Sequence, residues 1–368
     1  MDAGPTEASG CSEPTNLVAD AQPLQRRRGR VTTRAVARVL VGVAAAIVVG
    51  WLVASVRADL RDAISLLGHV NLGWTAVALA AGFVTLALFA GVRVVLVGAV
   101  GGRLGVVESI GLTYASGAIA ASIPAGGPIA TAYVFGQYRR VGTDAGGATW
   151  ALLVNGVITP AALAVVGLAG LALASPSGAA AVLVPVGIAG AFVAVAVALL
   201  RSPDVLTRPI AAGMRVVQRL RGFPLDGVDE KAREITQRLG QVRPSRARWV
   251  TAVLVQIASW LVDVACLAAS ILAVGGTVPW RSLLTVYCAG QLVGRLPLLP
   301  AGLGQVETGL VVGLTAAHVP VAIGLAATLV YRVASQWIVV PIGWVCWWYR
   351  RRAAAADDTE LESHAAPA

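Results

Sequence analysis

Charged residues are scarce in this chain. Only 13% of its 368 residues are Asp, Glu, Lys or Arg, whereas soluble domains carry about 25%. Hydrophobic residues make up 57% of the chain, and the mean hydropathy is +0.75. About half of the usual solubilising charge is missing, which excludes an ordinary soluble domain. The composition therefore indicates a polytopic membrane protein.

Residues that hold metals or form disulfides are also few. The four cysteines and three histidines are scattered along the chain. No pair has the spacing of a metal site, so we expect no disulfide framework, no metal and no other cofactor. The patterns GxxxxGK, HExxH and GxSxG, which serve nucleotide binding, zinc hydrolysis and serine hydrolysis, do not occur in the sequence. We therefore expect no ATP-driven chemistry, no catalytic residues and a protein that is not an enzyme.

The charge that is present is mainly basic, with a formal net charge of +10. A nucleic-acid surface would interleave basic and aromatic residues on one face, but here the basic residues stand at the ends of apolar runs, so no nucleic-acid partner is expected. Basic clusters occur at Arg26–Arg30, Arg139–Arg140, 201–248 and Arg350–Arg352. Because basic loops remain on the cytoplasmic side, both termini are predicted to be cytoplasmic in a multi-pass protein of the plasma membrane.

Six apolar runs approach or exceed the ~20 residues that a helix needs to cross a bilayer. They are Val39–Val56, Trp74–Gly98, Ala145–Ala174, Gly178–Leu200, Trp249–Val274 and Val321–Trp348. The predicted organisation is a disordered basic cytoplasmic tail at 1–34, a transmembrane domain at 35–352 with a basic cytoplasmic loop at 201–248, and a disordered C-terminal tail at 353–368.

Two further apolar segments are interrupted by proline and glycine. Val106–Tyr138 is broken at IPAGGP, and Ser282–Ala317 is broken at LPAGLG. The tetrapeptides YASG and YCAG precede the two breaks, and the predicted orientation makes the hairpins enter from opposite sides. Inverted repeats with broken helices recur in secondary transporters. The predicted fold is an all-α integral membrane bundle with about six full spans, two broken hairpins that are re-entrant or short, and an inverted repeat.

The second break carries a family resemblance. LLPAGLGQVETGLVVGL, followed by TLVYRVASQWIVVPIGW, resembles the closing signature of the flippase-like membrane domain, the transmembrane region of lysylphosphatidylglycerol synthases, which also occurs alone. The resemblance covers about Val39–Trp348. It implies movement of lipids between leaflets, and the matching motif positions are Pro300, Gly302, Gly304, Glu307 and Arg332. Few residues follow Arg352, so we expect the stand-alone form without the aminoacyl-transferring domain.

Ionisable residues inside spans are costly and are functional candidates by default. We hypothesise that Arg332 or Arg295 contacts a lipid phosphate, because a guanidinium offers a planar fork to phosphate oxygens. Glu307 would hold the arginine or accept a cationic headgroup. The remaining substrate-binding candidates are the prolines and glycines of the two breaks: Pro124, Gly126, Gly127, Pro300, Gly302 and Gly304.

A purely structural interpretation competes with this site. Glu307 and Arg332 could form a buried ion pair that only fixes the hairpin. Asp263 is expected to pair structurally with Arg295, and two other charges, Arg93 and Glu108, are expected near the cytoplasmic interface, where charge costs little.

The sequence favours a flippase-like protein that translocates a phospholipid or a lipid-linked precursor, with anionic membrane lipids as partners. Transport of a small polar solute is an alternative. Others are an intramembrane transferase acting on a lipid donor, with Glu307 or Asp263 as its base, and a non-catalytic partner of a lipid-modifying enzyme.

Overall fold

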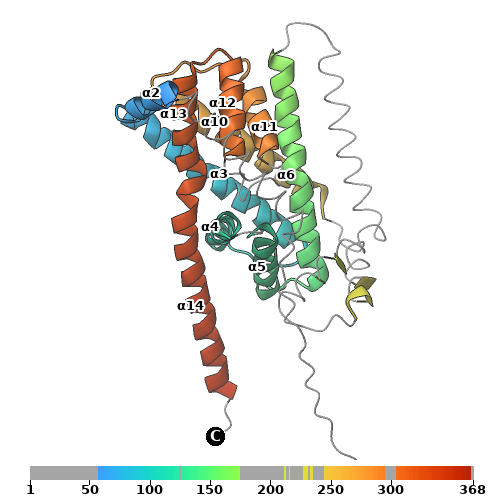
Figure 1. The fold of residues 1–368 in the computed structure, drawn as a ribbon. Helices are drawn as coiled ribbons and strands as arrows, with labels where there is room; N and C mark the ends of the chain where they lie inside the picture. The colour runs from blue at the N-terminus through green and yellow to red at the C-terminus, as the bar shows by residue number, and fades with distance from the viewer. Residues whose placement is uncertain are drawn as a thin grey trace, which may run out of the picture. The chain divides into compact units, whose positions relative to one another are not determined.

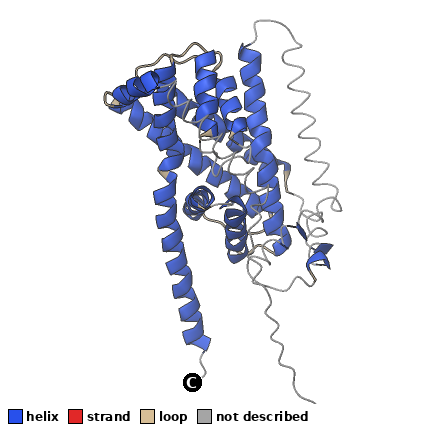
Figure 2. Cartoon of the chain, in the orientation of Figure 1, coloured by secondary structure: helices blue, strands red, loops and turns tan. Residues whose placement is uncertain are grey.

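The computed structural model describes the backbone of residues 57–123, 126–174, 244–294 and 304–365, and of a few residues between 211 and 234. Contacts divide the chain after Val56. The predicted tail at 1–34, the predicted spans Val39–Val56 and Gly178–Leu200, and most of the loop at 201–248 lie outside the described residues. In the described part, all regular structure is helical, with no strand (Figure 2).

Among the described residues, four helical stretches are long and apolar enough to cross a membrane. They are α3 (Leu72–Ala99), α6 (Ala145–Ala174), α10 (Arg246–Ala273) and a continuous stretch made of α13 (Val321–Arg332), the π-helix η2 (Val333–Trp337) and the first part of α14 (Val339–Ala365). These stretches confirm four of the six predicted spans to within a few residues (Figure 1).

Local sequence explains where the spans begin. The side chain of Asn71 accepts a hydrogen bond from the Trp74 amide at 3.2 Å before α3. Ser245 accepts one from the Arg248 amide at 3.4 Å before α10. A side-chain oxygen at this position satisfies one of the amides that a helix leaves free at its start.

Two helical segments differ from the sequence prediction. A short helix, α2 (Arg57–Leu67), precedes α3 and packs against α13. The helix α14 continues to Ala365 and so includes most of the segment predicted as a disordered tail. The run Ala353–Ala356 lies in this extension, and alanine has the highest intrinsic helix propensity.

The two predicted hairpins are present as pairs of short helices. The first hairpin consists of α4 (Val106–Ser122) and α5 (Gly126–Arg140), and the second of α11 (Leu283–Val293) and α12 (Gln305–Ala316). The arms of the second hairpin have 11 and 12 residues, which is well short of the ~20 needed for a crossing. Both pairs of helices are separated where the proline and glycine pattern predicts a break.

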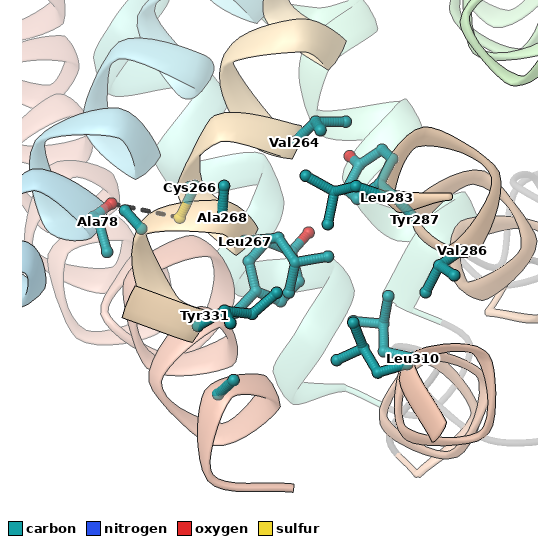
Figure 3. Close-up of a cluster of buried hydrophobic side chains, with 14 of the residues drawn as sticks. Ala78, Val264, Cys266, Leu267, Ala268, Leu283, Val286, Tyr287, Leu310 and Tyr331 are labelled. Atoms are coloured by element: carbon teal, nitrogen blue, oxygen red, sulfur yellow. Dashed lines mark hydrogen bonds between the residues drawn. The ribbon is translucent and has the colours of Figure 1, made fainter. Parts of the chain in front are cut away.

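The halves of the structure are packed reciprocally. The Asn71 amide donates to the Ala273 carbonyl at 2.8 Å, and the Cys266 thiol donates to the Ala78 carbonyl at 3.2 Å (Figure 3). Residue numbers rise along α3 as they fall along α10, so these corresponding spans are antiparallel. The first hairpin packs through α4 on α14, and the second packs through α11 on α6. The last span of each half thus packs on the hairpin of the other half.

Small residues allow the close helix contacts of this bundle. A Cβ atom on Gly82 of α3 would lie 2.4 Å from the carbonyl oxygen of Ala334 in η2. Helices in membranes associate largely through van der Waals packing, and small residues let their backbones approach. The glycine therefore holds α3 directly against the π-helix that follows Arg332.

Candidate functional site

A buried ion pair joins the second hairpin to the last helical stretch. The Nε of Arg332 in α13 donates to Oε1 of Glu307 in α12 at 2.6 Å. The two side chains are 5% and 17% exposed. At this burial, each charge depends on the other, because an isolated ion in a low-dielectric interior is strongly destabilised.

The first turn of α12 fixes the position of Glu307. Gly304 precedes the helix with φ of 81°, a left-handed conformation that glycine adopts without steric cost. Its amide donates to Oε2 of Glu307 at 2.8 Å, so the carboxylate also caps the start of the helix. Each oxygen of Glu307 already has a protein partner. Glu307 is consequently better placed to hold Arg332 than to accept a cationic headgroup.

Arg332 has donor capacity left over. Its Nη2 is buried and has no hydrogen-bond partner among the described residues. A buried polar group without a partner is costly and calls for an explanation. Glu307 occupies Nε, and Nη2 is a buried donor whose partner is not among the described residues; a guanidinium donor of this kind suits an acceptor such as a phosphate oxygen. The chain enters the π-helix η2 directly after Arg332, and such helices occur frequently at functional sites.

A second polar cluster lies among α10, α11 and α13. Oδ2 of Asp263 accepts hydrogen bonds from the hydroxyls of Tyr287 and Tyr331, the latter at 2.8 Å. Gln291 in turn donates to the Tyr331 hydroxyl at 2.9 Å. Asp263 is 5% exposed, and its Oδ1 is buried without a partner in the described part of the chain. Tyr331 is the neighbour of Arg332, so consecutive residues of α13 contact the two acids.

Both tyrosines belong to the hydrophobic core around the second hairpin. Figure 3 shows Tyr287 and Tyr331 among Leu267, Leu283 and Leu310, which are all buried. The two rings lie edge to face with centroids 6.4 Å apart. A phenol in such a core needs a partner for its hydroxyl, and Asp263 supplies one for both.

The structure brings three of the predicted site residues together: Gly304, Glu307 and Arg332. Arg295, Pro300 and Gly302 lie outside the described residues, and so does the expected pairing of Arg295 with Asp263.

The predicted glycines of the first hairpin lie at the start of its second helix. Gly126 and Gly127 begin α5, while Pro124 lies outside the described residues. A Cβ atom on Gly126 would lie 2.4 Å from the carbonyl oxygen of Ile119. Among the described contacts, none joins these glycines to Glu307 or Arg332.

Sequence reasoning missed the partners of Asp263. Tyr287 opens the YCAG tetrapeptide, and Tyr331 stands in the YR pair of the closing signature. Both residues belong to the motifs quoted above, but the sequence predicts a contact for neither. The available signal was chemical, because a tyrosine inside an apolar helix predicts a buried hydrogen-bond partner.

Three other charged residues within the helices, Arg93, Glu108 and Arg350, make contacts that involve the first hairpin. Arg93 donates to the Ser116 hydroxyl at 3.2 Å. Glu108 of α4 accepts from Arg350 of α14 at 3.2 Å, and Gln137 of α5 accepts from the same guanidinium at 2.8 Å. The Glu108 and Arg350 side chains are 39% and 18% exposed. Their contact places Glu108 and Arg350 on the same side of the bundle, and the cytoplasmic identity of that side stays a prediction.

These helices and buried charges define a multi-pass helical membrane protein whose second hairpin carries a buried ion pair. Residues 39–343 match the family model described as the lysylphosphatidylglycerol synthase TM region. The match covers most of the chain, which therefore belongs to this family, as the resemblance of its closing motif indicated.

Two archaeal proteins are similar to part of the chain. Both are UPF0104 membrane proteins of Methanothermobacter thermautotrophicus. The first is 37% identical over 91 residues, which cover 24% of this chain and 26% of the relative. The second is 30% identical over 84 residues, or 23% of this chain and 25% of the relative. The matches thus cover a minor part of each relative.

Proposed function

We propose that this protein moves an anionic phospholipid or a lipid-linked precursor between the leaflets of the plasma membrane, with both of its termini in the cytoplasm. The observation that carries the proposal is the Nη2 donor of Arg332, which is buried and has no partner among the described residues. Arg332 ends the 12-residue α13, roughly 16 Å of helix rise from its start. Ionisable residues inside membrane spans are rare, pair with one another and mark substrate paths.

The pairing with Glu307 suits a transport site. A headgroup phosphate has to shed water to enter the bilayer, and a guanidinium donor replaces part of that hydration. Because Glu307 already neutralises much of the charge on Arg332, the phosphate is held more weakly than by an unpaired arginine. A site that must release its cargo on the other side requires such moderate binding.

The contacts also weigh against Glu307 as the base of a transferase, since both of its oxygens have protein partners. A transferase would have to rely on Asp263, whose Oδ1 has none in the described part of the chain. An enzyme, a carrier of a small polar solute and a non-catalytic partner of a lipid-modifying enzyme remain as outcomes of the test.

The test is reconstitution of the full chain into vesicles that carry a fluorescent phosphatidylglycerol analogue. A membrane-impermeant reductant quenches the outer leaflet, and the protected fraction reports the inner one. We expect protein-containing vesicles to lose the protected fraction and empty vesicles to retain it. A new lipid product would indicate a transferase. The absence of both movement and product would contradict the proposal and indicate a partner role or a carrier of a small polar solute.

Variants separate the phosphate-binding role of Arg332 from a purely structural one. Arg332→Lys keeps the charge and loses the fork, and we expect about tenfold slower lipid movement, equivalent to about 1.4 kcal/mol. Arg350→Lys is the matched control, because Arg350 pairs with Glu108 of the other hairpin, and it should leave the rate nearly unchanged. Full activity in the exchanged double variant Glu307→Arg, Arg332→Glu would show that the pair is only structural.

A further inference from the structure

The charges of the described residues near α13 do not balance. Asp263 and Glu307 are the two carboxylates in contact with this part of the helix. Arg332 is the cation that acts on both among the described residues: it bonds Glu307 directly and acts on Asp263 electrostatically. If both carboxylates were ionised, the described cluster would carry one net negative charge. Each buried ion costs several kcal/mol even after relaxation.

The surroundings of Asp263 point to a second state of this side chain. Tyr287 of α11 and Tyr331 of α13 both donate to Oδ2. Oδ1 is buried and has no donor in the described part of the chain. A carboxylate oxygen can only accept hydrogen bonds, whereas a protonated carboxyl group can donate one and carries no charge. A proton on Oδ1 therefore removes the net charge without disturbing either tyrosine.

The described helices packed around Asp263 carry few other titratable groups. On its own helix, Cys266 lies within electrostatic reach. The α6 segment contains no titratable residue, and the one charged residue of α3, Arg93, bonds Ser116. The remaining titratable groups that face Asp263 are Tyr287, Tyr331 and Arg332.

We propose that Asp263 is a proton-binding site, and that its protonation is linked to the binding of an anionic headgroup at Arg332. In this step the Asp263 carboxylate takes one proton on Oδ1 and becomes a carboxylic acid, and no other bond changes. A phosphate at Arg332 adds negative charge to a cluster that already has an excess, and the proton offsets it. The proton site stands by itself, while its link to a lipid rests on the proposed function.

The chain provides a direct connection between the two sites. Tyr331 and Arg332 are consecutive, and the π-helix η2 begins immediately after them. A headgroup bound to the Arg332 guanidinium shifts the backbone of α13. The same backbone positions the Tyr331 hydroxyl, which donates a hydrogen bond to Asp263. Because the two binding events share this segment, each changes the affinity for the other by the same factor. Lipid and proton then move together, and a proton gradient drives the lipid.

The first test measures proton uptake by the purified full chain in detergent. Dihexanoyl phosphatidylglycerol is added to weakly buffered protein that contains a pH indicator, and dihexanoyl glycerol, which lacks the phosphate, is the control lipid. We expect the phosphatidylglycerol to cause uptake of about one proton per protein molecule, and the control lipid none. No uptake by the unaltered protein would overturn the linkage.

Two substitutions localise the proton. Asp263→Asn keeps the shape and an acceptor for the tyrosines, and it should abolish the uptake. Asp229→Asn is the matched control, because Asp229 is an exposed carboxylate paired with Arg215, and it should behave like the unaltered protein. Uptake that persists in Asp263→Asn would place the proton elsewhere and refute the assignment.

Infrared spectroscopy tests the proton site without any lipid. The infrared titration of the unaltered protein minus that of Asp263→Asn should show the stretching band of one protonated carboxyl group, because the other Asp and Glu residues contribute equally to both. A difference without such a band, for example because Arg295 keeps Asp263 ionised over the whole pH range, would overturn the proposal. If Asp263→Asn does not fold, proton uptake by the unaltered protein still decides.

The vesicle assay separates this inference from the proposed function. Lipid movement that responds to an imposed pH gradient in the unaltered protein, and not in Asp263→Asn, supports both. Lipid movement that does not depend on the pH gradient in either protein overturns the coupling of lipid to protons and still supports the proposed flippase function. No lipid movement, together with proton uptake and an infrared band, overturns the flippase and keeps the proton site.

Discussion

The two broken hairpins share a backbone plan and differ in charge. Each consists of two short helices, and each packs on the last span of the other half. The first hairpin turns between Ser122 and Gly126, and the neighbouring residues Ala130 and Thr131 of α5 are uncharged. The second places Glu307 one turn after its break, where it bonds Arg332. Two hairpins with the same backbone plan can thus differ in chemistry, because, among the described residues, only the second carries a buried ion pair next to its break.

An arginine of the last helical stretch ties each hairpin to it. Arg350 bonds Glu108 of the first hairpin, and Arg332 bonds Glu307 of the second. The two arginines are 18 residues apart (350 − 332), which corresponds to roughly 27 Å of helix rise. The Arg332–Glu307 pair is buried, whereas the Arg350–Glu108 pair is partly exposed, so the energies of the two pairs should differ.

The largest expected effect breaks the buried pair. Arg332→Ala leaves the Glu307 carboxylate, 17% exposed, without its cation, and we expect a loss of about 3–5 kcal/mol in the free energy of unfolding. Arg350→Ala, opposite a Glu108 side chain that is 39% exposed, should lose only about 0–1 kcal/mol, because water screens the remaining charge. Denaturant unfolding of both variants in the same detergent measures the difference, and equal losses would contradict it.

A middle-sized effect concerns the support of the first hairpin. A Cβ atom on Gly343 of α14 would lie 2.2 Å from the Tyr114 carbonyl oxygen, so Gly343→Ala should force α4 and α14 apart and cost about 1–3 kcal/mol. Gly111→Ala on α4 meets nothing within 4 Å and should be neutral or stabilising by up to about 1 kcal/mol. Thermal unfolding compares the two variants. Proton uptake at Asp263 should survive in both, and its loss in Gly343→Ala would mean that the hairpins are not independent.

The smallest effect compares the starts of the two second arms. Gly304→Ala places a side chain at φ of 81°, and we expect a loss of about 1–2 kcal/mol. Gly127→Ala, in the first turn of α5, has open space around the new methyl group and should cause no loss. The difference in melting temperature between these variants is the readout. An undamaged Gly304→Ala protein would show that the left-handed residue does not limit the second break.

The sequence predicted the positions of the elements better than their contacts. The four described spans and the two breaks follow from apolar run length and from proline and glycine, because a bilayer fixes the length that a helix needs. The tyrosine contacts of Asp263 join residues 24 and 68 positions apart, and no local pattern encodes such a separation. The Glu307–Arg332 pair was foreseeable as one of two alternatives, since both residues lie in the closing motif.

By itself, the sequence determined that this protein is a helical membrane protein of the lysylphosphatidylglycerol synthase TM region family, and where its helices break. Only the tertiary structure decided which buried atoms are satisfied. In this structure both oxygens of Glu307 accept hydrogen bonds from protein donors. Arg332 Nη2 and Asp263 Oδ1 have no partners in the described part of the chain. The physical reason is that the length of an apolar run can be read from consecutive residues. A hydrogen bond, in contrast, needs two atoms that only the packing of distant segments brings within about 3 Å of each other.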